Sequence, residues 1–128
     1  MLRSIVAIII AVVTWFIVAT VVNWILRAAL PGYSLAEVSL NFTLTMMIWR
    51  LVLGLLSSLC AGFVCAVIAG RSKAAPKIVA AIMVVLFLPV HYMLWSKFPI
   101  WYHLFFLISL APTVLIGASI RAASRAAR

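Results

Sequence analysis

Apolar stretches alternate with short polar segments along this 128-residue chain, and the pattern occurs four times. Each stretch holds about twenty residues, the length that a helix needs to cross the hydrocarbon core of a bilayer. We predict membrane-spanning helices at about residues 5–26, 46–70, 78–95 and 99–120. No polar block is long enough for a second domain, so residues 1–128 are expected to form one all-α domain, an antiparallel bundle of four transmembrane helices.

The segment between the first two predicted spans, residues 27–45, contains turn and helix-start signals. A proline–glycine pair marks a turn. Ser34 and Glu37 follow with the spacing of a capping box, in which the two side chains satisfy free backbone donors at a helix start. One helix from there to Gly70 would be roughly 55 Å long, too long for a single span. We therefore expect a short interfacial helix and then a break near residues 41–45.

Composition supports a membrane location. Hydrophobic residues make up 69% of the chain and charged residues only 9%, whereas a soluble domain carries roughly a quarter charged residues. The net charge of +9 would also suit nucleic acid, but the basic residues cluster at the ends of predicted spans, where they favour anionic lipid head groups. We expect no nucleic-acid partner. The first span is longer than a signal-peptide core, so it is expected to be retained.

The distribution of lysine and arginine predicts an orientation. The N-terminus, the loop at residues 71–77 and the C-terminal tail together hold seven basic residues, against three in the other two loops. Because positive charge collects on the cytoplasmic side, both termini are expected in the cytoplasm, with anionic lipids at that face. Interfacial aromatics agree, because the following residues all fall at the opposite face: Trp24, Tyr33, Trp49, Tyr92, Trp95, Trp101 and Tyr102.

The second span has one face of small side chains. They recur every four residues, at Gly54, Ser58, Gly62, Ala66 and Gly70. Small faces let helix backbones approach closely, which gives packing contacts that lipid cannot match. The fourth span has a shorter matching row, Ser109, Thr113 and Gly117, and is the first choice of partner. The first span and a second copy of the chain are the alternatives.

Two histidines, His91 and His103, stand almost symmetrically around Lys97 in the last predicted hairpin. The favoured interpretation is an aromatic belt at the membrane interface, in which case Trp95→Ala and Trp101→Ala should do more harm than histidine-to-glutamine changes. The alternatives are a hydrogen bond that packs the two helices and a metal or haem site. A metal site usually needs further ligands, and the hairpin contains no Cys, Asp or Glu. We therefore expect no metal and no cofactor.

Glu37 is the only acidic residue, and Arg50 lies about one turn inside the second span. A membrane arginine is costly unless it finds a partner or extends to the head groups, so Arg50 either pairs with Glu37 or snorkels. Small multidrug exporters of similar size carry an essential glutamate deep in their first span. The first span here has none, which argues against that class.

Two segments, "FTLTMMIWRLVLGLLSSLCAG" and "LPVHYMLWSKFPIWYHLFFLISLAP", resemble a group of small bacterial four-span integral membrane proteins to which no function is assigned. The resemblance covers the chain from the Leu30-Pro31-Gly32-Tyr33 turn to Gly117. It implies a multi-pass protein of the bacterial inner membrane and carries no substrate or reaction.

Function is constrained mainly by what the sequence lacks. Nucleophile motifs, glycine-rich phosphate loops and paired carboxylates are absent, so an enzyme is not expected. The leading hypothesis is a non-catalytic packing partner or accessory subunit of a membrane assembly, acting with another membrane protein or as a homo-oligomer. The rivals are a small oligomeric transporter or channel, with Arg50, Glu37 and both histidines lining an outer vestibule, and a haem- or metal-binding helix pair.

Overall fold

The computed structural model describes residues 1–128 and contains five α-helices and no strands. The four long helices are α1 (Leu2–Ala29), α3 (Leu44–Ala69), α4 (Ala74–Met93) and α5 (Ile100–Ala126), and each is long and apolar enough to cross a membrane. The short helix α2 (Tyr33–Ser39) lies between α1 and α3. This confirms the predicted all-α four-span architecture with a short helix between the first two spans.

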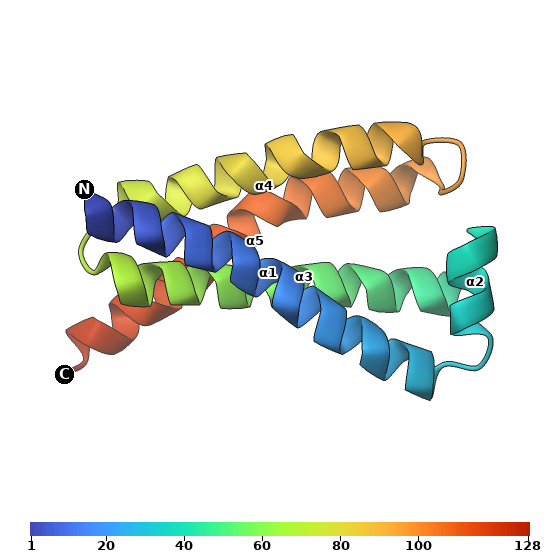
Figure 1. Cartoon of the computed structure of the whole chain (residues 1–128), viewed down its shortest axis with the longest axis horizontal. Coiled ribbons are helices and arrows are strands. Elements are labelled where there is room, and N and C mark those ends of the chain that lie inside the picture. Colours follow the sequence, from blue (N-terminus) through green and yellow to red (C-terminus); the bar gives the residue numbers. More distant parts are fainter.

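Consecutive long helices run in opposite directions, so α1 and α4 are antiparallel to α3, whereas α5 is parallel to it (Figure 1). Both chain termini lie at one end of the bundle, called here the terminal end, and α2 lies at the other, called the α2 end. Helices α1 and α5 pack most extensively against α3, and α4 packs mainly on α5. In Figure 1, α1 crosses α3 obliquely, so that it leaves α4 as it approaches the α2 end.

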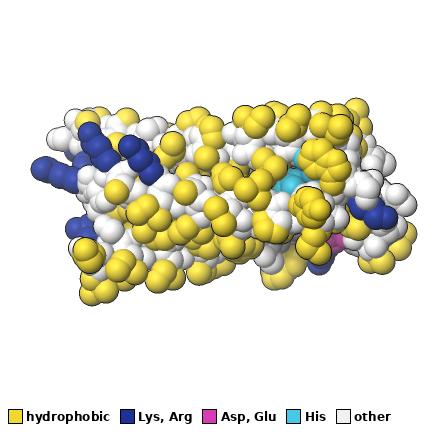
Figure 2. Space-filling view, turned by 90° about the horizontal axis from the view of Figure 1, so that it is seen from above, with side chains coloured by type: hydrophobic (Ala, Val, Ile, Leu, Met, Phe, Trp, Pro, Cys, Tyr) yellow, Lys and Arg dark blue, Asp and Glu magenta, His cyan; other side chains and the backbone are white.

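Hydrophobic side chains cover most of the outside of the bundle between its two ends, and basic side chains gather at the terminal end (Figure 2). Soluble monomers rarely expose apolar patches of this extent, because the patches would drive aggregation in water. An apolar outer surface along four spanning helices is what a bilayer requires, and the protein is accordingly a multi-pass membrane protein.

Backbone geometry explains the turns on either side of α2. Leu30 is extended because the following proline disfavours helical geometry, and Gly32 then adopts a left-handed conformation with φ of 78°. Leu40 ends α2 with φ of 60°. Thr43 restarts the helix as the N-cap of α3, since its hydroxyl accepts a hydrogen bond from the amide of Met46 at 3.3 Å. The break expected near residues 41–45 is therefore present.

The predicted capping box is wrong. Helix α2 begins at Tyr33, two residues earlier than the box required, with Gly32 as N-cap and no side-chain cap. The carboxylate of Glu37 instead bonds side chains of α1. A charged partner on a neighbouring helix holds a carboxylate more strongly than a backbone amide does, so the tertiary contact prevails over the local one.

The small face of α3 packs against α5 at two glycines. A Cβ atom added to Gly62 would lie 1.9 Å from the carbonyl oxygen of Val114, and one added to Gly117 would lie 2.2 Å from that of Leu59. Backbone therefore meets backbone in both directions, and only glycine leaves room for it. The ring of Phe106 fills the space above Gly54, where an added Cβ would lie 2.8 Å from the ring edge.

The other members of the two small rows serve different neighbours. Ser58 accepts a hydrogen bond from Nε1 of Trp15 on α1 at 3.0 Å and donates to the carbonyl of Gly54. Ser109 and Thr113 donate to carbonyls of their own helix. Ser58 thus gives the small face of α3 a second neighbour, α1.

Arginines cap α3 at the terminal end. Arg125 donates to the carbonyl oxygens of Gly70 and Ala66 at 2.9 and 3.2 Å, and Arg3 donates to that of Ile68. These carbonyls belong to the last turn, where a helix has no internal donors and carries partial negative charge. Two residues counted above as topology signals therefore also hold the ends of α1 and α5 against α3.

Candidate functional site

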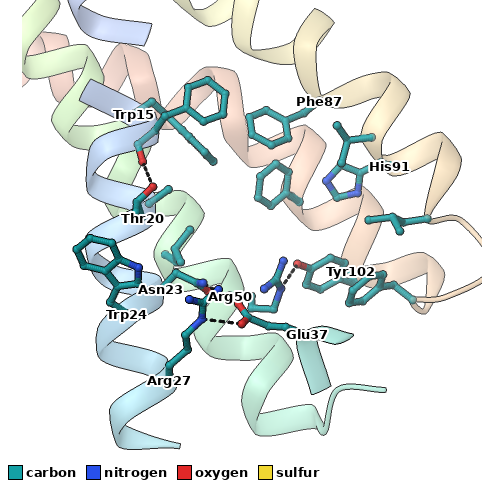
Figure 3. Close-up of a pocket in the computed structure, with 17 residues that line it drawn as sticks. Trp15, Thr20, Asn23, Trp24, Arg27, Glu37, Arg50, Phe87, His91 and Tyr102 are labelled. Carbon is teal, nitrogen blue, oxygen red and sulfur yellow. Dashed lines mark hydrogen bonds and ion pairs between the residues drawn. The ribbon is translucent and has the colours of Figure 1, made fainter. Parts of the chain in front are cut away.

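Five side chains at the α2 end form one continuous chain of hydrogen bonds, which we call the α2 polar network: Asn23, Arg27, Tyr33, Glu37 and Arg50. Nη1 of Arg50 donates to the Tyr33 hydroxyl at 2.9 Å, and that hydroxyl donates to Oδ1 of Asn23 at 2.8 Å. Nδ2 of Asn23 donates to one oxygen of Glu37 at 2.6 Å, and Nε of Arg27 donates to the other at 2.7 Å. The network joins α1, α2 and α3, and Figure 3 shows its Glu37–Arg27 bond.

Tyr33 is the centre of the α2 polar network and is completely buried. Burial raises the pKa of its hydroxyl above the ordinary value, because the charged form would lose its hydration, although the charge of Arg50 opposes the shift. The neutral hydroxyl can accept from Arg50 and donate to Asn23 at the same time. This double role requires the proton, so the network is directed from Arg50 towards Glu37.

Arg50 is held by neutral groups. Besides Tyr33, its Nε atom donates to the Tyr102 hydroxyl at 3.4 Å, and its guanidinium carbon lies 4.7 Å from the centre of the Phe42 ring. Glu37 forms its ion pair with Arg27 instead. Arg50 therefore does not bond Glu37 directly, and groups within the bundle hold its guanidinium. The predicted Glu37–Arg50 pair is realised only indirectly, through two intervening side chains.

One guanidinium nitrogen of Arg50 remains available. Nη2 has no hydrogen-bond partner in the protein and is not sealed from outside. Arg50 lies at the end of the second turn of α3, about 9 Å along the helix axis from its start at about 1.5 Å per residue. An arginine keeps its charge under all ordinary conditions. The bundle thus holds a half-buried positive charge with a free donor and no carboxylate partner.

The two histidines face each other inside the protein. Nδ1 of His91 lies 2.7 Å from Nδ1 of His103, and the exposed fractions of the two side chains are 6% and 0%. Side chains of an interfacial belt would be exposed, so the belt interpretation does not fit these residues. It does fit Trp95 and Trp101, which are 47% and 44% exposed. The arrangement corresponds to the alternative in which the histidines join α4 to α5 by a hydrogen bond.

Hydrogen-bond partners assign the tautomers of both rings. Nε2 of His103 lies 3.3 Å from the carbonyl oxygen of Trp95, which can only accept, so Nε2 carries the proton. A neutral His103 then accepts at Nδ1, and His91 donates from its own Nδ1. The lone pair of His91 is left on Nε2, which has no partner in the protein and is not sealed. His91 therefore offers a free acceptor.

The distance between the rings suits a hydrogen bond better than a shared metal ion. Two nitrogens bound to one tetrahedral zinc ion at ordinary bond lengths lie about 3.3 Å apart, against 2.7 Å between the Nδ1 atoms. No group of three or more His, Cys, Asp or Glu side chains lies together in the structure. Cys60 and Cys65 are free thiols within α3, away from this hairpin.

A cavity of about 410 Å³ lies where α1 and α4 diverge, and we call it the α1–α4 cavity (Figure 3). Its polar lining comes from Asn23, Arg27, Glu37, Arg50 and His91, and the apolar walls include Trp15, Phe16, Phe87 and Phe106. Volumes of this size and apolar walls with a few convergent polar groups are typical of small-molecule sites. His103 lies behind His91 and does not line it. Of the four residues predicted to line an outer vestibule, Arg50, Glu37 and His91 line this cavity and His103 does not.

Sequence reasoning missed three polar members of the site: Asn23, Tyr33 and Tyr102. A signal was available for the first, because an amide inside an apolar span is expensive unless it is hydrogen-bonded, and Arg27 follows four residues later on the same helix face. The tyrosines gave no such signal. Aromatic residues near span ends usually anchor at the interface, and only the fold reveals that these two bind Arg50.

Comparisons with known proteins add no functional information. Searches of the chain against protein-family models, curated proteins and solved structures gave no match. Any functional conclusion must therefore come from the geometry of the site.

Proposed function

We propose that this multi-pass membrane protein acts by binding a ligand in the α1–α4 cavity, without covalent catalysis. The observation that carries the proposal is the state of Arg50, a half-buried cation in the cavity wall with a free Nη2 donor and only neutral partners. An uncompensated charge at membrane depth is costly, and a bound ligand that accepts from it recovers part of that cost. Residues of this kind in membrane proteins usually serve function.

Binding accounts for the cavity better than acid–base chemistry. Glu37 is the only carboxylate side chain, and both its oxygens already accept hydrogen bonds from α1. These bonds and the ion pair with Arg27 hold the carboxylate in the α2 polar network, which gives it a structural role there. The free Nε2 of His91 serves as an acceptor that orients a ligand.

An accessory-subunit role is less well supported than the small-residue row suggested. That row was expected to be a contact surface, and α5 and α1 occupy it within the chain. The partner surface would have to be elsewhere. Purification in mild detergent would reveal a membrane-protein partner or a second copy of the chain, but the proposed binding function does not depend on either.

We place the protein in a bacterial inner membrane with the terminal end in the cytoplasm. Seven basic residues near that end support this orientation and an interaction with anionic lipids there. The α1–α4 cavity then opens sideways into the outer leaflet, where lipid-soluble compounds have direct access.

Native mass spectrometry of the protein purified in mild detergent tests the proposal. We expect the wild-type chain to carry a small molecule, and Ala19→Leu, which places a larger side chain in the cavity wall, to lose it. Val18→Leu adds bulk to the neighbouring position of α1 outside the cavity lining and should retain the molecule. Equal ligand content in the two variants, or no ligand in the wild type, would overturn the proposed binding function.

A further inference from the structure

We propose that the ligand of the α1–α4 cavity is an amphiphile whose head group carries one negative charge and a hydrogen-bond donor, and whose hydrocarbon chain lies along α1. This inference rests on the binding function proposed above and specifies the ligand. Three features of the cavity support it independently: its charge, its free acceptor and its apolar continuation.

The charge of the lining calls for one negative charge. Arg27 and Glu37 neutralise each other at 2.7 Å, which leaves the charge of Arg50. Hydroxyl groups and a ring face solvate a cation but do not neutralise it, so the site keeps one uncompensated positive charge. A phosphate diester or a similar monoanion satisfies both the charge and the free Nη2 donor.

The free acceptor, Nε2 of His91, indicates that the head group also carries a hydrogen-bond donor. His91 and Arg50 approach the same side chain, since the His91 ring lies 6.1 Å from the Tyr102 ring, and the Tyr102 hydroxyl accepts from Arg50. Because Arg50 and His91 also line the same cavity, the proposed head group contacts both of them. A hydroxyl placed a few bonds from the anion would donate there, whereas a quaternary ammonium group has no hydrogen to donate.

The apolar continuation calls for a hydrocarbon chain. A groove on the outer surface of α1, formed mainly by Val12, Val13, Ile17 and Val21, shares Phe16, Thr20 and Trp24 with the cavity. The polar cavity therefore borders an apolar groove on the outer surface of the bundle. Figure 2 shows this change of character, with a histidine visible in a hollow between hydrophobic side chains.

Glycerol phosphodiesters carry the required head group, and two sources can supply one. A diacyl phosphatidylglycerol comes from the surrounding bilayer, whereas a single-chain lysophosphatidylglycerol can arrive as a free compound. Only one apolar groove continues from the cavity, so the second chain of a diacyl lipid would remain in the bilayer. The experiment compares both.

Native mass spectrometry of the full chain, with the co-purified ligand exchanged for defined lipids, provides the test. We expect phosphatidylglycerol or its lyso form to bind about tenfold better than the matching choline lipid. The phosphate of the choline lipid can still accept from Arg50, but its ammonium group cancels the net negative charge and has no hydrogen to donate to His91. Whichever form binds more tightly identifies the source. Arg50→Gln should remove the part of the preference that comes from charge, Arg50→Lys should keep most of it, and Arg71→Gln, at the other end of the bundle, should leave the preference unchanged.

Phosphatidylmethanol, which has the same charge and no head-group hydroxyl, tests the acceptor. Phosphatidylmethanol should bind the wild type more weakly than phosphatidylglycerol does. The two lipids should bind His91→Phe with equal affinity. Each preference is a ratio measured within one sample, so partial loss of folded protein does not imitate it.

The outcomes separate the two proposals. Equal binding of the choline and glycerol lipids, or an unchanged preference in Arg50→Gln, would overturn the proposal that the ligand is an anionic amphiphile. The Ala19→Leu variant would still test whether the cavity binds a ligand at all. A co-purified ligand that is not an amphiphile, yet is lost in Ala19→Leu, would also overturn the anionic amphiphile. If no compound binds in a way that Ala19→Leu prevents, the binding function itself fails.

Discussion

Arg50 shows how neutral groups can hold a charge within a membrane bundle. Two tyrosine hydroxyls and the face of Phe42 surround its guanidinium group, at 2.9, 3.4 and 4.7 Å. Each tyrosine is buried and comes from a different helix. The charge is therefore fixed in position instead of moving freely to the head groups, and this fixed position is what gives the cavity its chemistry.

Tyr33 should make the protein sensitive to alkali. Its pKa is raised in the folded state, so its stabilising contribution is complete below about pH 10, its value in the unfolded chain, and is lost as pH rises through the folded-state pKa. Thermal unfolding in detergent between neutral pH and about pH 11.5 measures this loss. Tyr33→Phe should be less stable at neutral pH and lose less stability in alkali.

Tyr92 provides the control for this measurement, because its side chain is 83% exposed and has no place in the α2 polar network. Tyr92→Phe should follow the wild-type alkaline curve. If Tyr33→Phe and the wild type lose stability in parallel above pH 10, the α2 polar network does not depend on the Tyr33 proton.

The histidine pair reverses the order of damage that the belt interpretation predicts. His103→Gln removes a completely buried ring that bonds both His91 and the Trp95 carbonyl, and leaving a buried polar group unsatisfied costs about 1–3 kcal/mol. Trp101→Ala removes a side chain that is already 44% exposed. We expect His103→Gln to lower the unfolding temperature in detergent by more than Trp101→Ala.

A double-mutant cycle separates the hydrogen bond from general packing. His91→Leu, His103→Leu and the double variant should show a coupling energy of about 1 kcal/mol or more, because each single change orphans the other ring. Additive losses within experimental error would argue that the two rings do not interact.

At the scale of helices, the α3–α5 contact depends on backbone proximity. Gly62→Ala and Gly117→Ala each place a methyl group against a backbone carbonyl that cannot rotate away, and overpacking of this kind costs about 1–3 kcal/mol. Gly54→Ala meets the edge of the Phe106 ring, which can shift, so it should cost less. Gly62→Leu should be worse than any of these.

Leu56→Ala is the matched control for the α3–α5 contact, since Leu56 is 43% exposed on the same helix. Thermal stability of the variants in one detergent gives the ranking. A Gly62→Ala variant as stable as Leu56→Ala would show that the two helices are further apart than the structure places them.

At the scale of the whole molecule, the four spans put both termini and the α3–α4 turn on one side of the membrane. Single cysteines at Ser72 and Ser124, in a background with Cys60 and Cys65 replaced by alanine, should react with an impermeant maleimide only after the cells are permeabilised. A cysteine at Ser34, in α2, should react in intact cells. Reaction of Ser72 or Ser124 from outside would reverse the proposed orientation.

The helical architecture follows from local features of the sequence. Apolar runs of membrane-spanning length set the number of helices, and the Pro31–Gly32 turn set the start of α2. A row of five small side chains at four-residue spacing marked the face of α3 that meets α5. These features are encoded locally, because bilayer thickness fixes helix length and backbone approach requires glycine wherever it occurs. The same reasoning favoured the fourth span as the partner of this row, but it left the first span and a second copy of the chain as alternatives.

The pairing of the polar side chains, in contrast, depends on how the helices pack. Glu37 had a plausible local partner in the capping box and a plausible distant one in Arg50, and it binds Asn23 and Arg27 instead. Periodicity fixes which face of a helix a side chain occupies, but the crossing of α1 over α3 fixes which faces meet. That crossing opens the α1–α4 cavity, brings the network residues together and turns two residues expected at the interface, His91 and Tyr102, towards Arg50.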